Sequence, residues 1–418
     1  MAIAQRFTLL ALGVCLILAS AGVLLAETAS AIQAESGAAA DTSAAGRPWV
    51  SAYYAGWYWD AMGSSGNPAT AIAMVDMTTM THFIFGTYAP GIGATAGQIL
   101  EAAGTAHTQV EDGLISKAHT NSVKALMMIG GMGAGSEYAD STASAHRATF
   151  ITNILNKCIT KNYDGVDIDW EEELEGNTTN QNQLKAFLSE LRTAAALRSR
   201  YQPPNAPFII TFPGFCVNIN FLPIEPWRAD VAALVDQYNL MSYSQNYAGS
   251  GWDSWFFGAL KDAAPTHPTS IEASVQAYVD AGVTRSKIGM GIGLYGNYYI
   301  SPITAPRQHP TDGKLWGNDD NSDYWAALYN AGMLDPTKYT FDAAAQTGYY
   351  TYSPAKVFNT NPVTMLTTED LDSIAAKGAW AKAGNCGGTI VWMINYGYVP
   401  ALKTNPPMAA IKKAFLGP

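Results

Sequence analysis

The chain has 418 residues, of which 48% are hydrophobic and 14% are charged, and its formal net charge is −10. This length allows one large domain or two ordinary ones, and the low charge content excludes a disordered, highly solvated chain. The negative balance argues against nucleic acid and against anionic membrane surfaces as partners.

The N-terminus has the pattern of a secretory signal. Arg6 precedes the apolar run 7–26, and Ala29-Ser30-Ala31 forms a cleavage site of small residues. We therefore expect a signal peptide at 1–31 and a flexible leader, rich in Ala, Ser, Gly and Thr, at 32–46. The mature protein would be secreted, without membrane association. An uncleaved segment would instead leave it anchored or periplasmic.

Short apolar runs separated by helix-like segments follow along the rest of the chain. Helical spacing of apolar residues marks two of the intervening segments, at 150–158 and 184–195. The expected strands are 50–55, 82–88, 124–129, 165–170, 208–212, 237–243, 287–292 and 388–393.

This alternation predicts an α/β fold, a (β/α)₈ TIM barrel over 47–418. A doubly wound open sheet is the competing architecture, but no Gly-x-Gly-x-x-Gly loop follows the first strand. The segment at about 297–350 is long and rich in Tyr, Asp, Asn, Pro and Gly. It is interpreted as a small insertion between the seventh and eighth strands.

Beyond the signal segment the cysteines are Cys158, Cys216 and Cys386, an odd number with wide spacing. They are interpreted as buried free thiols, with one disulfide left open. Because the sequence contains neither a Cys-x-x-Cys pair nor a His/Cys cluster, we expect no metal and no cofactor.

Three acids alternate along the fourth expected strand and the residue after it. Because successive side chains of a strand point to opposite faces, Asp167, Asp169 and Glu171 share one face. In a barrel this face is the interior, where neighbouring acids about 7 Å apart along the strand cannot all ionise. At least one pKa should rise, with protons shared by the group. A raised carboxyl pKa suits a general acid that works near neutral pH.

Two other interpretations of these acids are an edge strand in water and a calcium or magnesium site. The apolar residues between the acids favour burial, and calcium loops prefer turns that contain glycine. We therefore favour a catalytic role, at the strand end where barrel enzymes place their chemistry.

The segment Asp164-Gly-Val-Asp167-Ile-Asp169-Trp-Glu171 resembles the D-x-x-D-x-D-x-E signature of family 18 glycoside hydrolases, the chitinase family. The resemblance extends along most of the chain. Gly130 and Gly131 resemble the end of that family's S-x-G-G motif, and 237–243 resembles the strand with its M-x-Y motif. The segments 291–296 and 388–392 resemble its last two barrel strands.

The resemblance implies a substrate-assisted, retaining glycosidase for β-1,4-linked N-acetylglucosamine chains. Glu171 would be the catalytic acid and base, and Asp169 would stabilise an oxazolinium intermediate. Asp167 would share a proton with Asp169, and Tyr243 would contact the acetamido carbonyl. Asp164 would complete the structural motif with the two glycines. The partner would be an oligosaccharide or polysaccharide containing N-acetylglucosamine, bound by a monomer.

Aromatic and apolar side chains at the strand ends and in the following loops are expected to bind sugar, although core packing would explain them equally. These candidates are Trp392, Tyr53, Trp57, Met241, Tyr295 and Trp252, with Tyr58, Trp59, Trp255 and Phe256 as further members of the same loops.

The chain departs from the family pattern at three positions. Met128 stands in place of the Ser of S-x-G-G, Ser244 in place of the acid that follows M-x-Y, and Asn297 in place of a frequent Arg. Two alternative functions are therefore kept. One is an endo-β-N-acetylglucosaminidase acting on the core of N-linked glycans, and the other is a chitin-binding lectin without turnover. Lectin relatives typically lose the terminal Glu, which this chain retains as Glu171.

Overall fold

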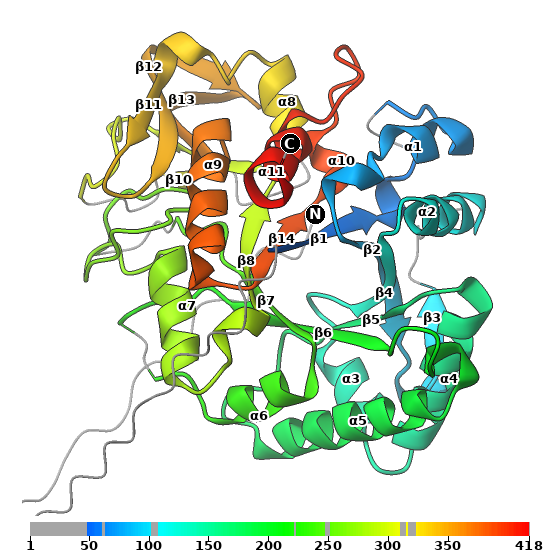
Figure 1. The fold of residues 1–418 in the computed structure, drawn as a ribbon. Helices are drawn as coiled ribbons and strands as arrows, with labels where there is room; N and C mark the ends of the chain where they lie inside the picture. The colour runs from blue at the N-terminus through cyan, green and yellow to red at the C-terminus, as the bar shows by residue number, and fades with distance from the viewer. Residues whose placement is uncertain are drawn as a thin grey trace, which may run out of the picture. The chain divides into compact units, whose positions relative to one another are not determined.

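The computed structural model describes residues 48–417, apart from 61–62, 102–107, 221–222, 247–250, 310–314 and 317–322 (Figure 1). The expected signal peptide at 1–31 and the leader at 32–46 lie outside the described residues. The cysteines at 158, 216 and 386 are free thiols, as expected.

Within the described residues, eight parallel strands close into a barrel. Their order is β1-β14-β8-β7-β6-β5-β4-β2, and the pairing of β1 with β2 completes the ring. Each corresponds to an expected strand, so the predicted (β/α)₈ fold is confirmed. Their bounds are β1 Trp49–Ala55, β2 His82–Pro90, β4 Lys124–Gly130, β5 Gly165–Asp169, β6 Ile209–Phe215, β7 Gln237–Met241, β8 Ile288–Gly293 and β14 Gly388–Trp392. The short β3 (Ile99–Glu101) pairs with β2 in antiparallel register.

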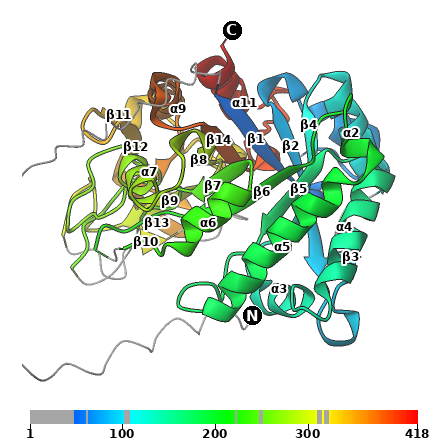
Figure 2. The same cartoon turned by 60° about the horizontal axis from the view of Figure 1, so that its bottom comes forward.

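Helices surround this barrel (Figures 1 and 2). The apolar residues that predicted helices at 150–158 and 184–195 are buried in α4 and α5, because they form one face at a period of 3.6 residues. The helices that follow the strands are α1 Pro68–Met74, α2 Thr108–Thr120, α3 Gly135–Ser141, α4 Arg147–Lys161, α5 Thr178–Ala196, α6 Trp227–Leu234, α7 Ile271–Asp280, α9 Leu371–Trp380, α10 Ile394–Gly397 and α11 Pro406–Ile411.

The chain segment between β8 and β14 forms a second sheet. Among the described residues its strand order is β10-β9-β13-β12-β11. Both views place it at one side of the barrel, near α7 and α9 (Figures 1 and 2). Its elements are β9 Gly296–Ile300, β10 Leu315–Trp316, α8 Trp325–Asn330, β11 Tyr339–Asp342, β12 Thr347–Phe358 and β13 Asn361–Thr368. The insertion expected at about 297–350 falls in this region, and β12 runs past residue 350 before the chain returns as β13.

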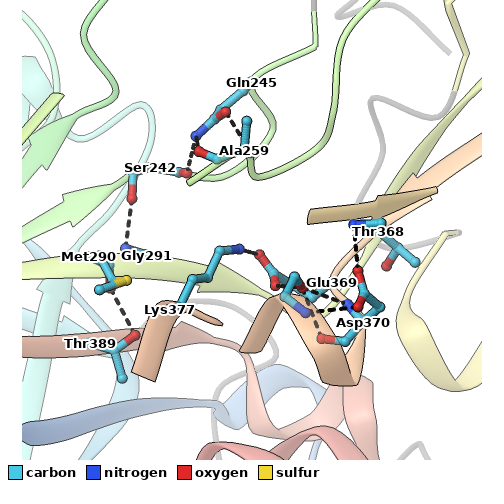
Figure 3. Close-up of polar contacts among 12 residues, drawn as sticks. Ser242, Gln245, Ala259, Met290, Gly291, Thr368, Glu369, Asp370, Lys377 and Thr389 are labelled. Atoms are coloured by element: carbon cyan, nitrogen blue, oxygen red, sulfur yellow. Dashed lines mark hydrogen bonds and ion pairs between the residues drawn. The ribbon is translucent and has the colours of Figure 1, made fainter. Parts of the chain in front are cut away.

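A buried ion pair fixes α9 to the end of this sheet (Figure 3). Lys377 of α9 is 0% exposed and pairs with the carboxylate of Glu369, which directly follows β13 and is 1% exposed. Ser373 donates a hydrogen bond to the second carboxylate oxygen at 2.9 Å. A Cβ added to Gly258, in the loop after β7, would lie 2.6 Å from Glu369 Oε1. The pair therefore joins α9, the small sheet and that loop.

Removal of the lysine should destabilise the fold strongly. Lys377→Met leaves Glu369 as a buried charge without its cation, and we expect the free energy of unfolding to fall by about 3 to 5 kcal/mol. The double variant Glu369→Leu/Lys377→Met should recover much of this loss, because no buried charge remains. Urea unfolding followed by tryptophan fluorescence measures both.

The matched control is the exposed pair of Lys261 and Glu272, whose side chains are 43% and 47% exposed. Lys261→Met should change the free energy of unfolding by less than about 1 kcal/mol. Equal effects of the two lysine variants would contradict a stabilising role for the buried pair.

Candidate active site

The alternating acids of β5 enter the barrel interior, as the strand periodicity predicts. Asp167 is 0% exposed and Asp169 is 6% exposed, while the apolar residues between them belong to the hydrophobic core. Glu171 follows the strand and is half-buried. The three carboxyl groups therefore pass from the closed interior towards the C-terminal end of the barrel.

A cavity of about 460 Å³ lies at this end, and Asp169 and Glu171 are part of its wall. Asp167 is not among the described residues that line it, so this carboxyl group lies deeper in the barrel. The wall is completed by Tyr53, Trp57, Thr87, Met128, Gly130, Gly131, Met132, Pro213, Asn239, Met241, Tyr243, Ile390, Trp392 and Tyr396.

Gly130 and Gly131 allow the end of β4 to approach β5 closely. Both have positive φ angles, 92° and 107°, a region that other L-residues rarely adopt. The amide of Gly131 donates to the carbonyl of Asp169 at 2.8 Å, and a Cβ on Gly130 would lie 2.6 Å from that carbonyl oxygen. The two glycines thus hold the backbone of the central acid.

The surroundings of the acids raise their pKa values. Burial, followed by the charges of Glu171 and Asp167, raises the pKa of Asp169 well above its usual range. Burial, followed by the charges of Glu172 and Asp167, raises the pKa of Glu171 to about 7. Burial also raises the pKa of Asp167 to about 6, although the hydroxyl groups of Thr211 and Tyr53 lower it. At neutral pH the group therefore retains protons, and Glu171 can deliver one into the cavity.

Aromatic rings form one side of the cavity. The ring of Trp392, at the end of β14, lies 5.6 Å from that of Tyr53 and 6.2 Å from that of Trp57, measured between centroids. The end of β7, two strands away from β14 in the barrel, contributes Met241, and the loop that follows contributes Tyr243. Such an arrangement offers apolar ring faces beside carboxyl groups, which suits a sugar with an apolar face and polar edges.

Asp164, the first acid of the motif, has a different place. It lies before β5, at the opposite end from Glu171, and accepts hydrogen bonds from the Ala125 amide and from His119, both at 2.9 Å. Arg200 contacts its other oxygen at 3.1 Å. Although burial raises the pKa of Asp164, the Ala125 amide, His119 and the charge of Lys124 lower it below its usual value. Asp164 therefore fastens β5 to its neighbours and is remote from the cavity.

Two predicted sugar contacts lie outside the wall of this cavity. Neither Tyr295 nor Trp252 is among the described residues that line it. The ring of Tyr295 packs between Phe257 and Tyr243, at 4.6 and 5.9 Å, and so supports Tyr243 from behind. The loop that contains Trp252 packs against the small sheet, where Trp255 and Phe256 are buried in a separate apolar cluster.

Several cavity residues were missed by sequence reasoning, among them Asn239 and Tyr396. Asn239 could have been found, because it precedes Met241 and Tyr243 at alternate positions of the same strand. It donates a hydrogen bond to the Tyr53 hydroxyl at 3.3 Å. Tyr396 lies in the short α10 after β14, and no periodic pattern marks it.

The family model for glycosyl hydrolases family 18 matches residues 50–397 of this sequence, and the chain belongs to that family. Among curated relatives, Chitinase 1 of Aphanocladium album is 29% identical over 323 residues, which are 75% of this chain and 71% of that protein.

Solved structures of the same fold include chitinases and a pseudo-chitinase. The Group IV chitinase of Ostrinia furnacalis in complex with allosamidin has a TM-score of 0.69 at 19% identity, over 88% of this chain and 99% of that one. Human YKL-39, described as a pseudo-chitinase with retained chitooligosaccharide binding, has a TM-score of 0.70 at 18% identity, over 89% and 100%. At these identities the likeness shows the fold alone.

No helix of the described residues has the length and apolar character needed to cross a membrane. No group of three or more His, Cys, Asp and Glu side chains in the same residues is arranged to hold a metal ion.

The neighbouring acid Glu172 provides a test of the electrostatics. Its charge helps to raise the pKa of Glu171, and its carboxylate is held by the Gly133 amide at 2.6 Å. Glu172→Gln should therefore lower the pKa of Glu171 by about one pH unit. Carbon-13 NMR of glutamate labelled at the side-chain carboxyl measures this pKa directly.

Glu173→Gln is the matched control, because Glu173 is exposed and accepts a hydrogen bond from Ser136. It should leave the pKa of Glu171 unchanged. An unchanged titration in Glu172→Gln would remove Glu172 from the electrostatic account.

Proposed function

We propose that this protein is a secreted, retaining glycoside hydrolase that cleaves β-1,4 bonds between N-acetylglucosamine units of chitin or chito-oligosaccharides. The observation that carries the proposal is Glu171, a carboxyl group with a pKa raised to about 7, in the same cavity wall as Asp169. Family membership and the chitinase names of relatives support the reaction class.

In the proposed first step, Glu171 donates its proton to the glycosidic oxygen, and the bond from that oxygen to the anomeric carbon breaks. The carbonyl oxygen of the substrate's own 2-acetamido group attacks the anomeric carbon and forms a positively charged oxazolinium. Asp169 hydrogen-bonds the acetamido N–H and stabilises the new charge, while Tyr243 donates to the acetamido oxygen. Asp167, behind Asp169, shares its proton and adjusts its charge.

In the second step, the ionised Glu171 takes a proton from water, and the water oxygen bonds to the anomeric carbon as the oxazolinium opens. Two displacements at the same carbon retain its configuration. Glu171 ends protonated, ready for another cycle. No separate enzyme nucleophile is needed, since the substrate supplies the attacking oxygen.

The aromatic side chains that line the cavity support the choice of a sugar substrate. Trp392, with Tyr53 and Trp57 close to it, offers ring faces for a pyranose, and the acetamido group would face Asp169 and Tyr243. The partner is an uncharged oligosaccharide, bound by a monomer. The N-terminal signal pattern supports secretion.

A lectin without turnover is the second candidate, because a non-catalytic protein shares this fold and retains chitooligosaccharide binding. The observation that favours an enzyme is that Glu171 is present and its pKa is raised to about 7. The two candidates differ in turnover but not in binding.

Glu171→Gln separates them. The amide keeps the shape of the side chain but cannot supply a proton, so we expect turnover of chitohexaose to fall by about 10³-fold or more, with its affinity nearly unchanged. Initial rates and isothermal titration measure the two quantities. An unchanged rate would remove Glu171 from the mechanism.

The acetamido group of the substrate should be indispensable. Cellohexaose has the same linkage but a hydroxyl at carbon 2, so no oxazolinium can form, and we expect no detectable cleavage under conditions that hydrolyse chitohexaose. Product analysis by chromatography is sufficient. Efficient cleavage of cellohexaose would refute substrate assistance.

A further inference from the structure

The innermost carboxylate, Asp167, lies between two different neighbours in the barrel. In the register of the sheet, it is level with Met128 of β4 on one side and with Thr211 of β6 on the other. Met128 has a thioether and no hydrogen to donate to a carboxylate. The hydroxyl of Thr211 does donate, to Asp167 Oδ1.

This hydrogen bond is made where water does not reach. Asp167 and Thr211 are both 0% exposed, and Asp167 Oδ2 has no hydrogen-bond partner among the described residues. Hydroxyl groups, of Thr211 first and then of Tyr53, oppose the effect of burial on the pKa of Asp167. A buried carboxylate without compensating donors takes up a proton instead of remaining charged.

The charged and titratable groups around Asp167 make its ionised form depend more strongly on the hydrogen bond from Thr211. Asp169 and Glu171 of its own segment repel its charge, and the other titratable groups that face it are Tyr53 of β1 and Tyr138 of α3. The groups that lower the pKa of Asp167 are hydroxyls, and no cationic side chain of the described residues is among them.

We propose that Thr211 is a positioning residue of the active site: its hydroxyl holds Asp167 in place as the carboxylate of the group, so that Asp169 and Glu171 hold the protons. This inference deepens the proposed function and rests on it. Thr211 does not line the cavity and acts through Asp167 alone. The negative charge that it keeps on Asp167 lies beside Asp169, the group that faces the oxazolinium.

Loss of the Thr211 hydroxyl should change the pH dependence of kcat/KM in a definite direction. If Asp167 must be ionised for turnover, its ionisation sets the acidic limb of kcat/KM, while the proton of Glu171 sets the basic limb. Loss of a hydrogen bond to a buried charge raises the pH at which that charge forms. The acidic limb should therefore move to higher pH, and the basic limb should move less.

The variants are Thr211→Val, which has nearly the same shape without the hydroxyl, and Thr211→Ser, which keeps the hydroxyl. With chitotetraose as substrate, Thr211→Val should displace the acidic limb upward by about one pH unit, whereas Thr211→Ser should follow the parent. Thr211→Ala replaces Thr211→Val if the latter does not fold. Coincident parent and Thr211→Val profiles, or equal displacement in Thr211→Ser, would overturn the inference.

A second comparison moves the donor to the other side of Asp167. In Met128→Ser/Thr211→Val a hydroxyl is restored at the same level of the sheet but on β4, and we expect the acidic limb to return towards that of the parent. No recovery in this folded double variant would mean that Thr211 acts by something other than donating to Asp167.

Carbon-13 NMR of aspartate labelled at the side-chain carboxyl gives a measurement that needs no turnover. Thr211→Val should raise the lowest of the pKa values assigned to the buried pair, and Thr211→Ser should not. If the parent hydrolyses no chitotetraose, the proposed function fails, and this titration alone decides the role of Thr211. Unchanged aspartate pKa values in Thr211→Val would overturn it.

Discussion

Burial of several acids on a single strand, followed by their mutual repulsion, is the constraint on which this site depends. Asp167 and Asp169 point into a barrel whose interior excludes water, and Glu171 follows at its edge. Because charges close together in such a medium cannot all form, protons remain on the group at neutral pH. The proton available at the cavity is thus a consequence of strand periodicity together with burial.

The surrounding fold keeps these acids in place instead of letting them escape to solvent. Asp164 fastens the start of β5 to β4 and α2, and the amide of Gly131 holds the carbonyl of Asp169 at the other end. On the far side, the pair of Glu369 and Lys377 joins α9 to the small sheet and to the loop after β7. Rigid attachment at several points is what a preorganised site requires.

Much of this arrangement could be predicted from the sequence, because it depends on local periodicity. The barrel strands, the shared face of Asp167, Asp169 and Glu171, and the apolar faces of α4 and α5 all follow from spacing along one segment. The place of Tyr295 behind Tyr243 and the contact of Thr211 with Asp167 could not be predicted. These depend on which residues of neighbouring strands are level with one another, and a single strand carries no information about that register. The packing of Trp255 and Phe256 against Tyr349 of the small sheet depends in the same way on contacts between distant segments.

In the proposed mechanism, the substrate's own acetamido group attacks the anomeric carbon while Glu171 supplies the proton. Proton NMR of the anomeric signals, recorded from the first minutes of chitohexaose hydrolysis beside a high-mannose glycopeptide, tests it most directly. The account predicts that the β-anomer of the new reducing end appears first, with the α-anomer growing only by slow mutarotation, and that the glycopeptide stays intact. First appearance of the α-anomer, or release of glycan with chitohexaose untouched, would contradict it.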